Sequence, residues 1–229
     1  MSTLNEYEQR YLAMLDELSG SAEVQVFHEE RRPVSEITGD AKTAFEMIAD
    51  ELGIHLDASL RRTYMRFDGL SSYWAIERPG VYLTGEFSID HIATVMFDDG
   101  ADELITDETP EAERQIYSEL RVCDRHPRGG GGSLAGLRIN PGVAKPEVWY
   151  YHGTHGVSKL DIGYDEYLDA LLVTKGTYGW QYLFVEDPPV QEVEYQSALD
   201  DMRDMLQIFP DLFPRHDYAP FVSRLEARR

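Results

Sequence analysis

The sequence predicts a mixed α+β fold, and two kinds of pattern support this prediction. Apolar residues recur at three- and four-residue spacing near both ends of the chain, which predicts amphipathic helices there. Between them, residues 72–97 hold short apolar runs separated by Pro79-Gly80 and followed by Asp98-Asp99-Gly100, which predicts two or three antiparallel strands. With 229 residues and 42% apolar content, we expect a single domain spanning 1–229.

The first predicted elements are helices. Residues 5–18 place their apolar side chains on one helical face, which predicts a docked amphipathic helix. Asp40 is a suitable N-cap for a second helix that Gly53 ends. A shorter helical stripe covers residues 56–67, and we expect Gly69 to close it in the left-handed conformation.

The middle of the chain predicts one helix and one loop. Thr109-Pro110 is a typical helix entrance, so we expect a helix near 110–121. Four consecutive glycines within residues 126–133 predict a mobile loop. A phosphate-binding loop would need Gly-Lys-Ser/Thr at the start of a helix, but Ser133-Leu134-Ala135 follows these glycines instead.

Strand and helix signals alternate again in the last third. Residues 148–152 predict a strand, and residues 164–172 carry a helical stripe that Gly176 ends. An aromatic strand or turn is expected at 180–184, and a long amphipathic helix at 195–209.

The charge of the chain restricts its partners. Forty-two acidic side chains against 21 basic ones give a formal net charge of −21, which repels phosphate backbones and anionic membrane surfaces. We therefore expect no direct nucleic-acid or membrane binding, and a cationic protein is the favoured partner. The simpler interpretation is that the acidic surface only keeps the protein soluble.

The start of the chain and its cysteine indicate a compartment. The first ten residues lack the basic and apolar regions of a signal peptide, so we expect a cytoplasmic protein. The single cysteine, Cys123, has no partner for an internal disulfide, which fits a reducing environment. An inert thiol is favoured over a reactive one, because the sequence places no base beside it.

Known catalytic and metal-binding patterns are missing from the sequence. It has neither a Gly-x-Ser-x-Gly elbow nor a His-Glu-x-x-His helix, although a Ser/His/Asp site assembled from distant positions stays open. His152 and His155 have no third ligand fixed nearby, and Asp161, Asp165 and Asp169 fit a solvated helix face better than a calcium site. We expect no enzyme activity, no metal and no cofactor.

Several short motifs resemble the SUKH superfamily. They are Gly53-Ile54-His55-Leu56-Asp57, then Phe67-Asp68-Gly69, then Asp165-Glu166-Tyr167-Leu168, with the 148–152 strand and the 180–184 ending beside them. Asp57 stands where proline is usual in that family, and Asp68 where asparagine is usual. Aspartate also caps helices and tolerates turns, so both departures are mild.

This resemblance implies a mostly antiparallel central sheet flanked by helices, used as a binding scaffold. The matched core covers 40–185, while 1–35 and 186–229 are expected to form helical extensions at the N- and C-terminus. The bacterial members are mostly immunity proteins that neutralise partner toxins, and the family shares no catalytic residues.

The expected function is therefore that of a cytoplasmic immunity-type protein that binds and neutralises a cationic toxin. Many basic proteins of this kind are nucleases. The alternatives are a regulatory or signalling scaffold of the same fold, which would dock through its terminal helices, and a hydrolase with an unrecognised site.

Six residues are the candidate partner contacts. The densest acidic run of the chain, 98–113, contains no lysine or arginine, and a merely solvated run is its simpler interpretation. Adjacent strand residues face opposite sides of a sheet, so we expect one of the two aromatic candidates to lie in the core. The predicted rim charges and aromatic contacts are Asp98, Asp99, Asp102, Glu103, Tyr73 and Trp74.

Overall fold

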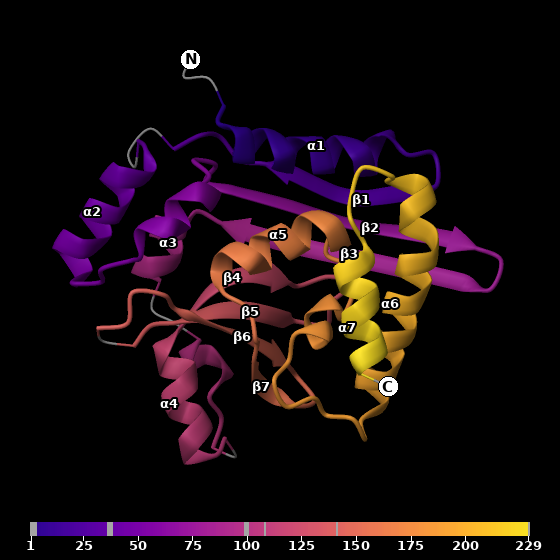
Figure 1. Ribbon diagram of the computed structural model, residues 1–229. Helices are drawn as coiled ribbons and strands as arrows, with labels where there is room; N and C mark the ends of the chain where they lie inside the picture. Colours follow the sequence, from indigo (N-terminus) through magenta and orange to yellow (C-terminus); the bar gives the residue numbers. More distant parts are fainter. Residues whose placement is uncertain (1–3, 36–38, 99–100, 108, 141, 229) are drawn as a thin grey trace.

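A single antiparallel sheet of seven strands organises the computed structural model, which describes residues 4–35, 39–98, 101–107, 109–140 and 142–228 (Figure 1). The strand order in the sheet follows the order in the chain. The strands are β1 (Val24–Arg31), β2 (Gly69–Arg78), β3 (Val81–Asp90), β4 (Leu120–His126), β5 (Ser133–Arg138), β6 (Glu147–His152) and β7 (Gly156–Lys159). The predicted α+β class is confirmed.

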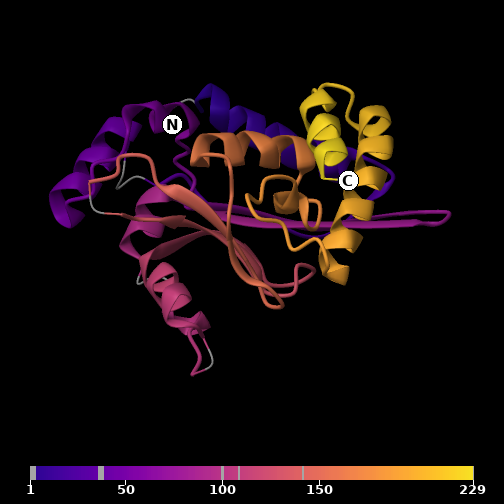
Figure 2. The ribbon, with the colours of Figure 1, turned by 60° about the horizontal axis from the view of Figure 1, so that its bottom comes forward.

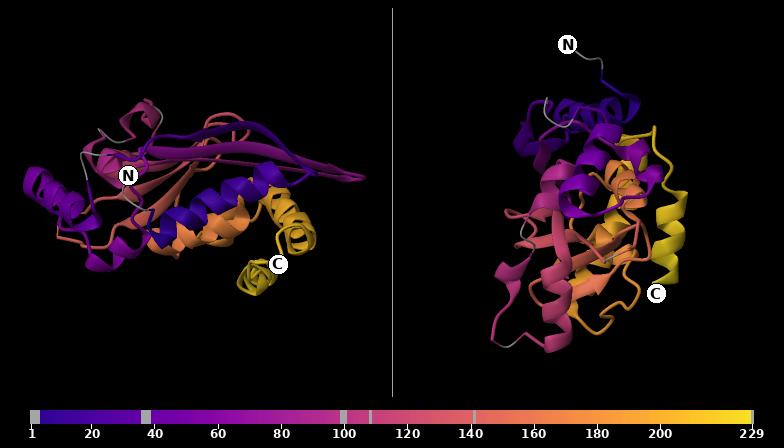
Figure 3. Two further views of the ribbon diagram at one scale, coloured as in Figure 1. Left: turned by 90° about the horizontal axis from the view of Figure 1, so that it is seen from above. Right: turned by 90° about the vertical axis from the view of Figure 1, so that its left-hand side faces the viewer.

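Most of the helical layer covers one side of this sheet, here called the first face. Helices α1, α5, α6 and α7 lie on it, whereas α4 lies on the opposite, second face (Figures 2 and 3). The helices are α1 (Glu6–Gly20), α2 (Ala41–Leu52), α3 (Ile92–Phe97), α4 (Glu111–Glu119), α5 (Tyr164–Thr174), α6 (Val193–Leu212) and α7 (Ala219–Ala227), with the 3₁₀ helices η1 (Ala58–Thr63), η2 (Asp102–Leu104) and η3 (Trp180–Leu183).

The first two predicted helices are confirmed by their capping groups. Asn5 and Glu8 form a reciprocal capping box at the start of α1. The side chain of Asp40 accepts a hydrogen bond from the Thr43 amide at 2.9 Å, and Gly53 ends α2 in the left-handed region at φ 68°. Local sequence therefore determines both ends of α2.

Two predictions for the first hundred residues are wrong. Residues 24–31 form an edge strand, so the segment 1–35 is not wholly helical. Gly69 does not close a helix but begins β2, where the Arg32 guanidinium lies 2.5 Å from the position of an added Cβ. Of the two or three strands predicted over 72–97, two form, β2 and β3, and residues 92–97 form α3, which the ring of His91 caps through the Ala93 amide at 3.1 Å.

Later elements agree with the predictions in kind but differ at their ends. Helix α4 starts after Pro110, as expected, but ends at Glu119, where β4 begins. Thr109 does not cap this helix, since its hydroxyl accepts a hydrogen bond from the Thr106 amide. Helix α5 ends one residue earlier than predicted, at a left-handed Lys175 (φ 52°) followed by Gly176 (φ 73°). The segment predicted as an aromatic strand or turn at 180–184 differs in kind, since residues 180–183 form the 3₁₀ helix η3.

The core is continuous across the first face. Tyr11 of α1, Phe209 of α6 and Trp74 of β2 are all fully buried and belong to one hydrophobic cluster. The terminal helices thus pack into the same core as the sheet. A smaller cluster, which includes Tyr117 and Leu134, lies between α4 and the second face.

Candidate functional site

The predicted acidic contacts lie beside β4. Residues 98–107, here called the acidic segment, run from the end of α3 through η2. Arg125 of β4 bridges two of its carboxylates, with nitrogen-to-oxygen distances of 3.4 Å to Asp98 and 3.4 Å to Glu103. Asp102 is exposed, and Asp99 lies outside the described residues. The structure therefore brings Asp98 and Glu103 together around one arginine.

The acidic segment borders the second face of the sheet. Arg125 pairs directly with Leu134, and paired residues of antiparallel strands place their side chains on the same face. Leu134 packs in the small cluster beneath α4, on the second face. A partner bound at the acidic segment therefore lies next to the second face.

The two aromatic candidates point to opposite faces of β2, as expected for adjacent strand residues. Trp74 is fully buried in the first-face core, and its indole Nε1 donates to the Lys175 carbonyl at 2.8 Å. The prediction that Trp74 contacts a partner is wrong for this fold. Tyr73 lies on the second face, where its ring packs against Phe27 at 5.2 Å between centroids.

The glycine-rich loop between β4 and β5 is held by a buried carboxylate. Glu86 of β3 accepts hydrogen bonds from three successive amides, at 3.0 Å from Arg128, 2.7 Å from Gly129 and 3.0 Å from Gly130. The Glu86 side chain is only 3% exposed. The prediction of a mobile loop is therefore wrong for residues 128–130. Their successive amides form an anion-binding site, and the carboxylate of Glu86 occupies it.

Three buried residues bring together the side-chain types of a hydrolase triad. Asp124 Oδ2 lies 3.2 Å from His126 Nε2, and His126 Nδ1 lies 3.1 Å from Ser133 Oγ. Asp124 also accepts hydrogen bonds from the Tyr167 hydroxyl at 2.8 Å and from the Ser88 amide at 2.8 Å. The sequence left such a distributed site open.

The geometry of this triad does not suit nucleophilic catalysis. The Ser133 hydroxyl donates to the Gly130 carbonyl at 2.8 Å, so its proton points away from His126 Nδ1. A histidine activates a serine only when the hydroxyl proton is directed at the free ring nitrogen. Ser133 is also only 1% exposed, which keeps a substrate away from it. This network instead anchors the base of the glycine-rich loop.

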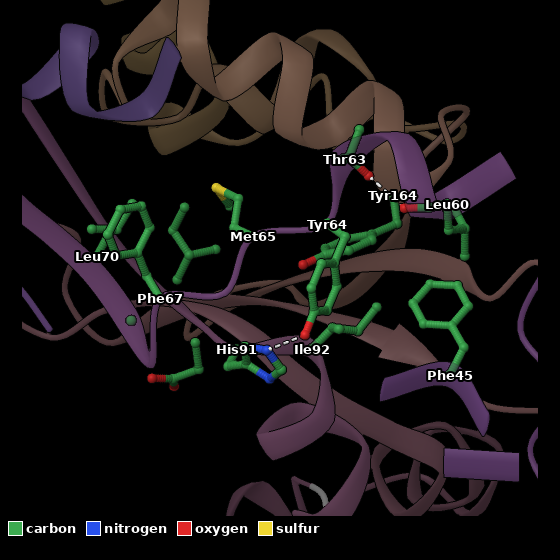
Figure 4. A pocket seen from close by; sticks show the side chains of 13 residues that line it. Phe45, Leu60, Thr63, Tyr64, Met65, Phe67, Leu70, His91, Ile92 and Tyr164 are labelled. Atoms are coloured by element: carbon green, nitrogen blue, oxygen red, sulfur yellow. Dashed lines mark hydrogen bonds between the residues drawn. The ribbon is translucent and has the colours of Figure 1, made fainter. Parts of the chain in front are cut away.

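A second buried histidine lines a small cavity between β3, α3 and η1 (Figure 4). The Nδ1 atom of His91 accepts from the Ala93 amide, so Nε2 carries the hydrogen and donates to the Tyr64 hydroxyl at 3.1 Å. Burial lowers the pKa of His91. The cavity has about 20 Å³, which suits one ordered water rather than a substrate.

The candidate metal ligands are engaged with other partners. Asp165 and Asp169 both lie 3.1 Å from Arg62, and Asp161 binds Arg224 at 2.8 Å. This carboxylate row is therefore neutralised by arginines. Within the part of the chain that the structure describes, no three His, Cys, Asp or Glu side chains are placed to hold a metal. His152 stacks on His155, with their ring centroids 5.1 Å apart.

Sequence reasoning missed two residues that shape the second face, Phe27 and Glu86. The alternation of Val24 and Val26 was the available signal for the strand that carries Phe27. No local signal pointed to Glu86, because the amides that it binds lie more than 40 positions away in the sequence.

Comparisons of this chain with protein-family models, with curated proteins and with solved structures found no match. The SUKH resemblance therefore rests on the short motifs alone. None of the described helices has the length and apolar content that a membrane span requires.

Proposed function

We propose that this protein is an immunity-type protein that binds a cationic protein toxin and blocks it by stoichiometric contact. The observation that carries the proposal is the acidic segment, which lies beside a sheet face and has two of its carboxylates bridged by Arg125. A net charge of −21 steers basic proteins toward such a surface and raises their association rates.

Binding accounts for the described geometry better than catalysis does. The cavity beside His91 has room for about one water, and the Ser133 hydroxyl is buried and donates to a backbone carbonyl. Neither arrangement offers a substrate an accessible nucleophile. The hydrolase alternative therefore has less support than a binding function.

The regulatory-scaffold alternative placed docking on the terminal helices. Tyr11 and Leu15 of α1, and Met202 and Phe209 of α6, are buried in the core and are not available to a partner. This burial favours the acidic segment over the terminal helices as the binding region.

The test begins with capture of the partner. Tagged protein is exposed to an extract of the cell from which the gene derives, washed at low and then high salt, and the eluate is identified by mass spectrometry. We expect a basic toxin-like protein that salt releases. The purified partner should lose its toxic activity at one equivalent of this protein, and a partner that keeps its activity contradicts the proposal.

Charge reversal then tests the acidic segment. Replacing Asp98, Asp102 and Glu103 with lysine should slow association about tenfold or more at low salt, because steering depends on local potential. The matched control carries lysine at three exposed acidic positions elsewhere, with the same change in net charge: Asp187, Glu192 and Asp211. Equal association rates for the two triple variants in stopped-flow measurements contradict a role for the acidic segment.

A further inference from the structure

Part of the second face of the sheet is not covered by any of the described helices. Helix α4 packs over β4, β5 and β6 through the small hydrophobic cluster, but it lies away from the long β2–β3 hairpin (Figures 1 and 2). Helices α1, α5, α6 and α7 cover the first face. The part of the second face formed by β1, β2 and β3 is here called the open sheet face.

An aromatic pair lies in the middle of the open sheet face. A bulge between Val26 and His28 leaves Phe27 as the extra residue of β1. The side chain of Phe27 packs on the ring of Tyr73 and is still 48% exposed. Tyr82, near the hairpin tip, is 60% exposed. Exposed aromatic side chains with rigid neighbours are the residues that most often anchor protein interfaces.

The surroundings of this pair are fixed before any partner arrives. The backbone of Gly129 lies so close to Tyr73 that an added Cβ would stand 2.5 Å from the ring. Glu86, which is paired with Tyr73 across the two strands, holds that loop through its three amide hydrogen bonds. A preorganised surface loses less conformational entropy on binding than a flexible one.

The charges around the open sheet face indicate a basic occupant. Two arginines beside it bind the chain's own carboxylates, Arg125 those of Asp98 and Glu103, and Arg128 that of Glu86 at 3.6 Å. None of the four lysines of the chain lies between residues 43 and 144. Asp102 and Glu77 are exposed and have no ion-pair partner among the described residues.

We infer that the open sheet face is the docking surface for the cationic protein. Apolar side chains of the partner cover Phe27 and Tyr73, while its lysines and arginines reach the acidic segment along the same face. This inference rests on the proposed function, which it deepens by naming the surface and the anchor residues.

Site-specific crosslinking in the cell tests the surface. The photoreactive residue p-benzoylphenylalanine replaces Phe27 in one full-length variant. It replaces Val193 of α6, which is 78% exposed, in a second variant, and Leu52 of α2, which is 38% exposed, in a third. After irradiation, crosslinked proteins are identified by mass spectrometry. We expect one basic protein crosslinked from position 27 and none from positions 193 and 52.

The other outcomes separate the two proposals. A basic partner crosslinked from position 52 or 193, and not from 27, overturns the surface and leaves the proposed function standing. An acidic protein or a second copy of this chain crosslinked from position 27 overturns the cationic occupant. No crosslink from any of the three positions, with all variants folded, overturns both.

The affinity for the crosslinked partner gives a second measurement. Phe27→Ala should weaken binding about tenfold or more, since truncation of a central aromatic anchor typically has effects of this size. Val193→Ala is the matched control and should leave the affinity unchanged. Melting curves of both variants separate lost binding from lost folding. Equal affinities for the two folded variants contradict the role of Phe27.

Discussion

The carboxylate of Glu86 should contribute more to stability than any exposed acidic group of the chain. Replacing Glu86 with alanine removes the acceptor of three amides, and Gly130 is buried, so water cannot easily replace the carboxylate there. Hydrogen bonds to charged groups contribute about 1.5–3 kcal/mol each. In the variant, the amides of the exposed residues Arg128 and Gly129 can bond to water instead, which offsets part of the lost hydrogen-bond energy. We expect a loss of about 3 kcal/mol in the free energy of unfolding.

The Glu86→Gln variant makes the test more specific. Glutamine keeps the shape of the side chain and one acceptor oxygen, but its NH₂ group faces the amide donors of the loop. We expect a loss of about 2 kcal/mol for this variant and a change within about 0.5 kcal/mol for the matched exposed control Glu77→Gln.

Urea unfolding at pH 7 measures these changes, and hydrogen exchange of the loop amides locates them. Exchange at residues 128–130 should accelerate selectively in both Glu86 variants. If Glu86→Gln and Glu77→Gln have the same stability, or if exchange in the loop is unchanged, the carboxylate does not hold the loop.

Three further outcomes are expected. Burial alone would raise the pKa of Glu8, but the hydrogen bonds from Arg66 lower it overall, so its stabilisation is present above the unfolded pKa of about 4.3 and disappears as pH falls. Glu8→Gln should therefore cost about 2 kcal/mol at pH 7 and progressively less as the pH is lowered below the unfolded pKa, as urea titrations would measure. Burial, followed by repulsion from Asp204, raises the pKa of Asp201 to about 6, so stability is lost as pH rises through that value. Asp201→Asn should gain about 1 kcal/mol at pH 8 and nothing at pH 4. Burial raises the pKa of the Cys123 thiol, which should react with a thiol reagent at pH 8 only after unfolding; reaction in the native protein contradicts that burial.

Elements whose ends depend on nearby residues were predictable from the sequence. Asp40 and Gly53 determine α2 through hydrogen bonds and backbone geometry within a few positions of each residue. The apolar stripe of α6 was equally clear, because a helix buried along one side repeats its apolar residues at a fixed spacing. These signals are local, and local reasoning is enough to interpret them.

The misread segments depend on contacts made far along the chain. Gly69 follows a helical pattern, but it lies against Arg32 and begins a strand. The glycine-rich loop has the composition of a flexible linker, and only the distant Glu86 fixes it. The same difference applies to the candidate site. The acidic segment could be identified from the local run of carboxylates, whereas Trp74 was misassigned because the sequence of a strand does not say which of its two faces is covered.

The order of strands in the sheet affects how the chain folds during synthesis. Each strand pairs with those before and after it in the chain. Short loops join β2 to β3 and β4 through β7, so these pairs can form early, whereas longer helical segments join β1 to β2 and β3 to β4. The helical layer is different, since Lys175 binds Glu17 from 158 positions away and His216 binds the same carboxylate from 199 positions away. A growing chain therefore displays the apolar side of a finished sheet until α6 emerges. Synthesis of α6 and α7, which follow every strand of the sheet in the chain, ends this exposure of apolar surface to aggregation.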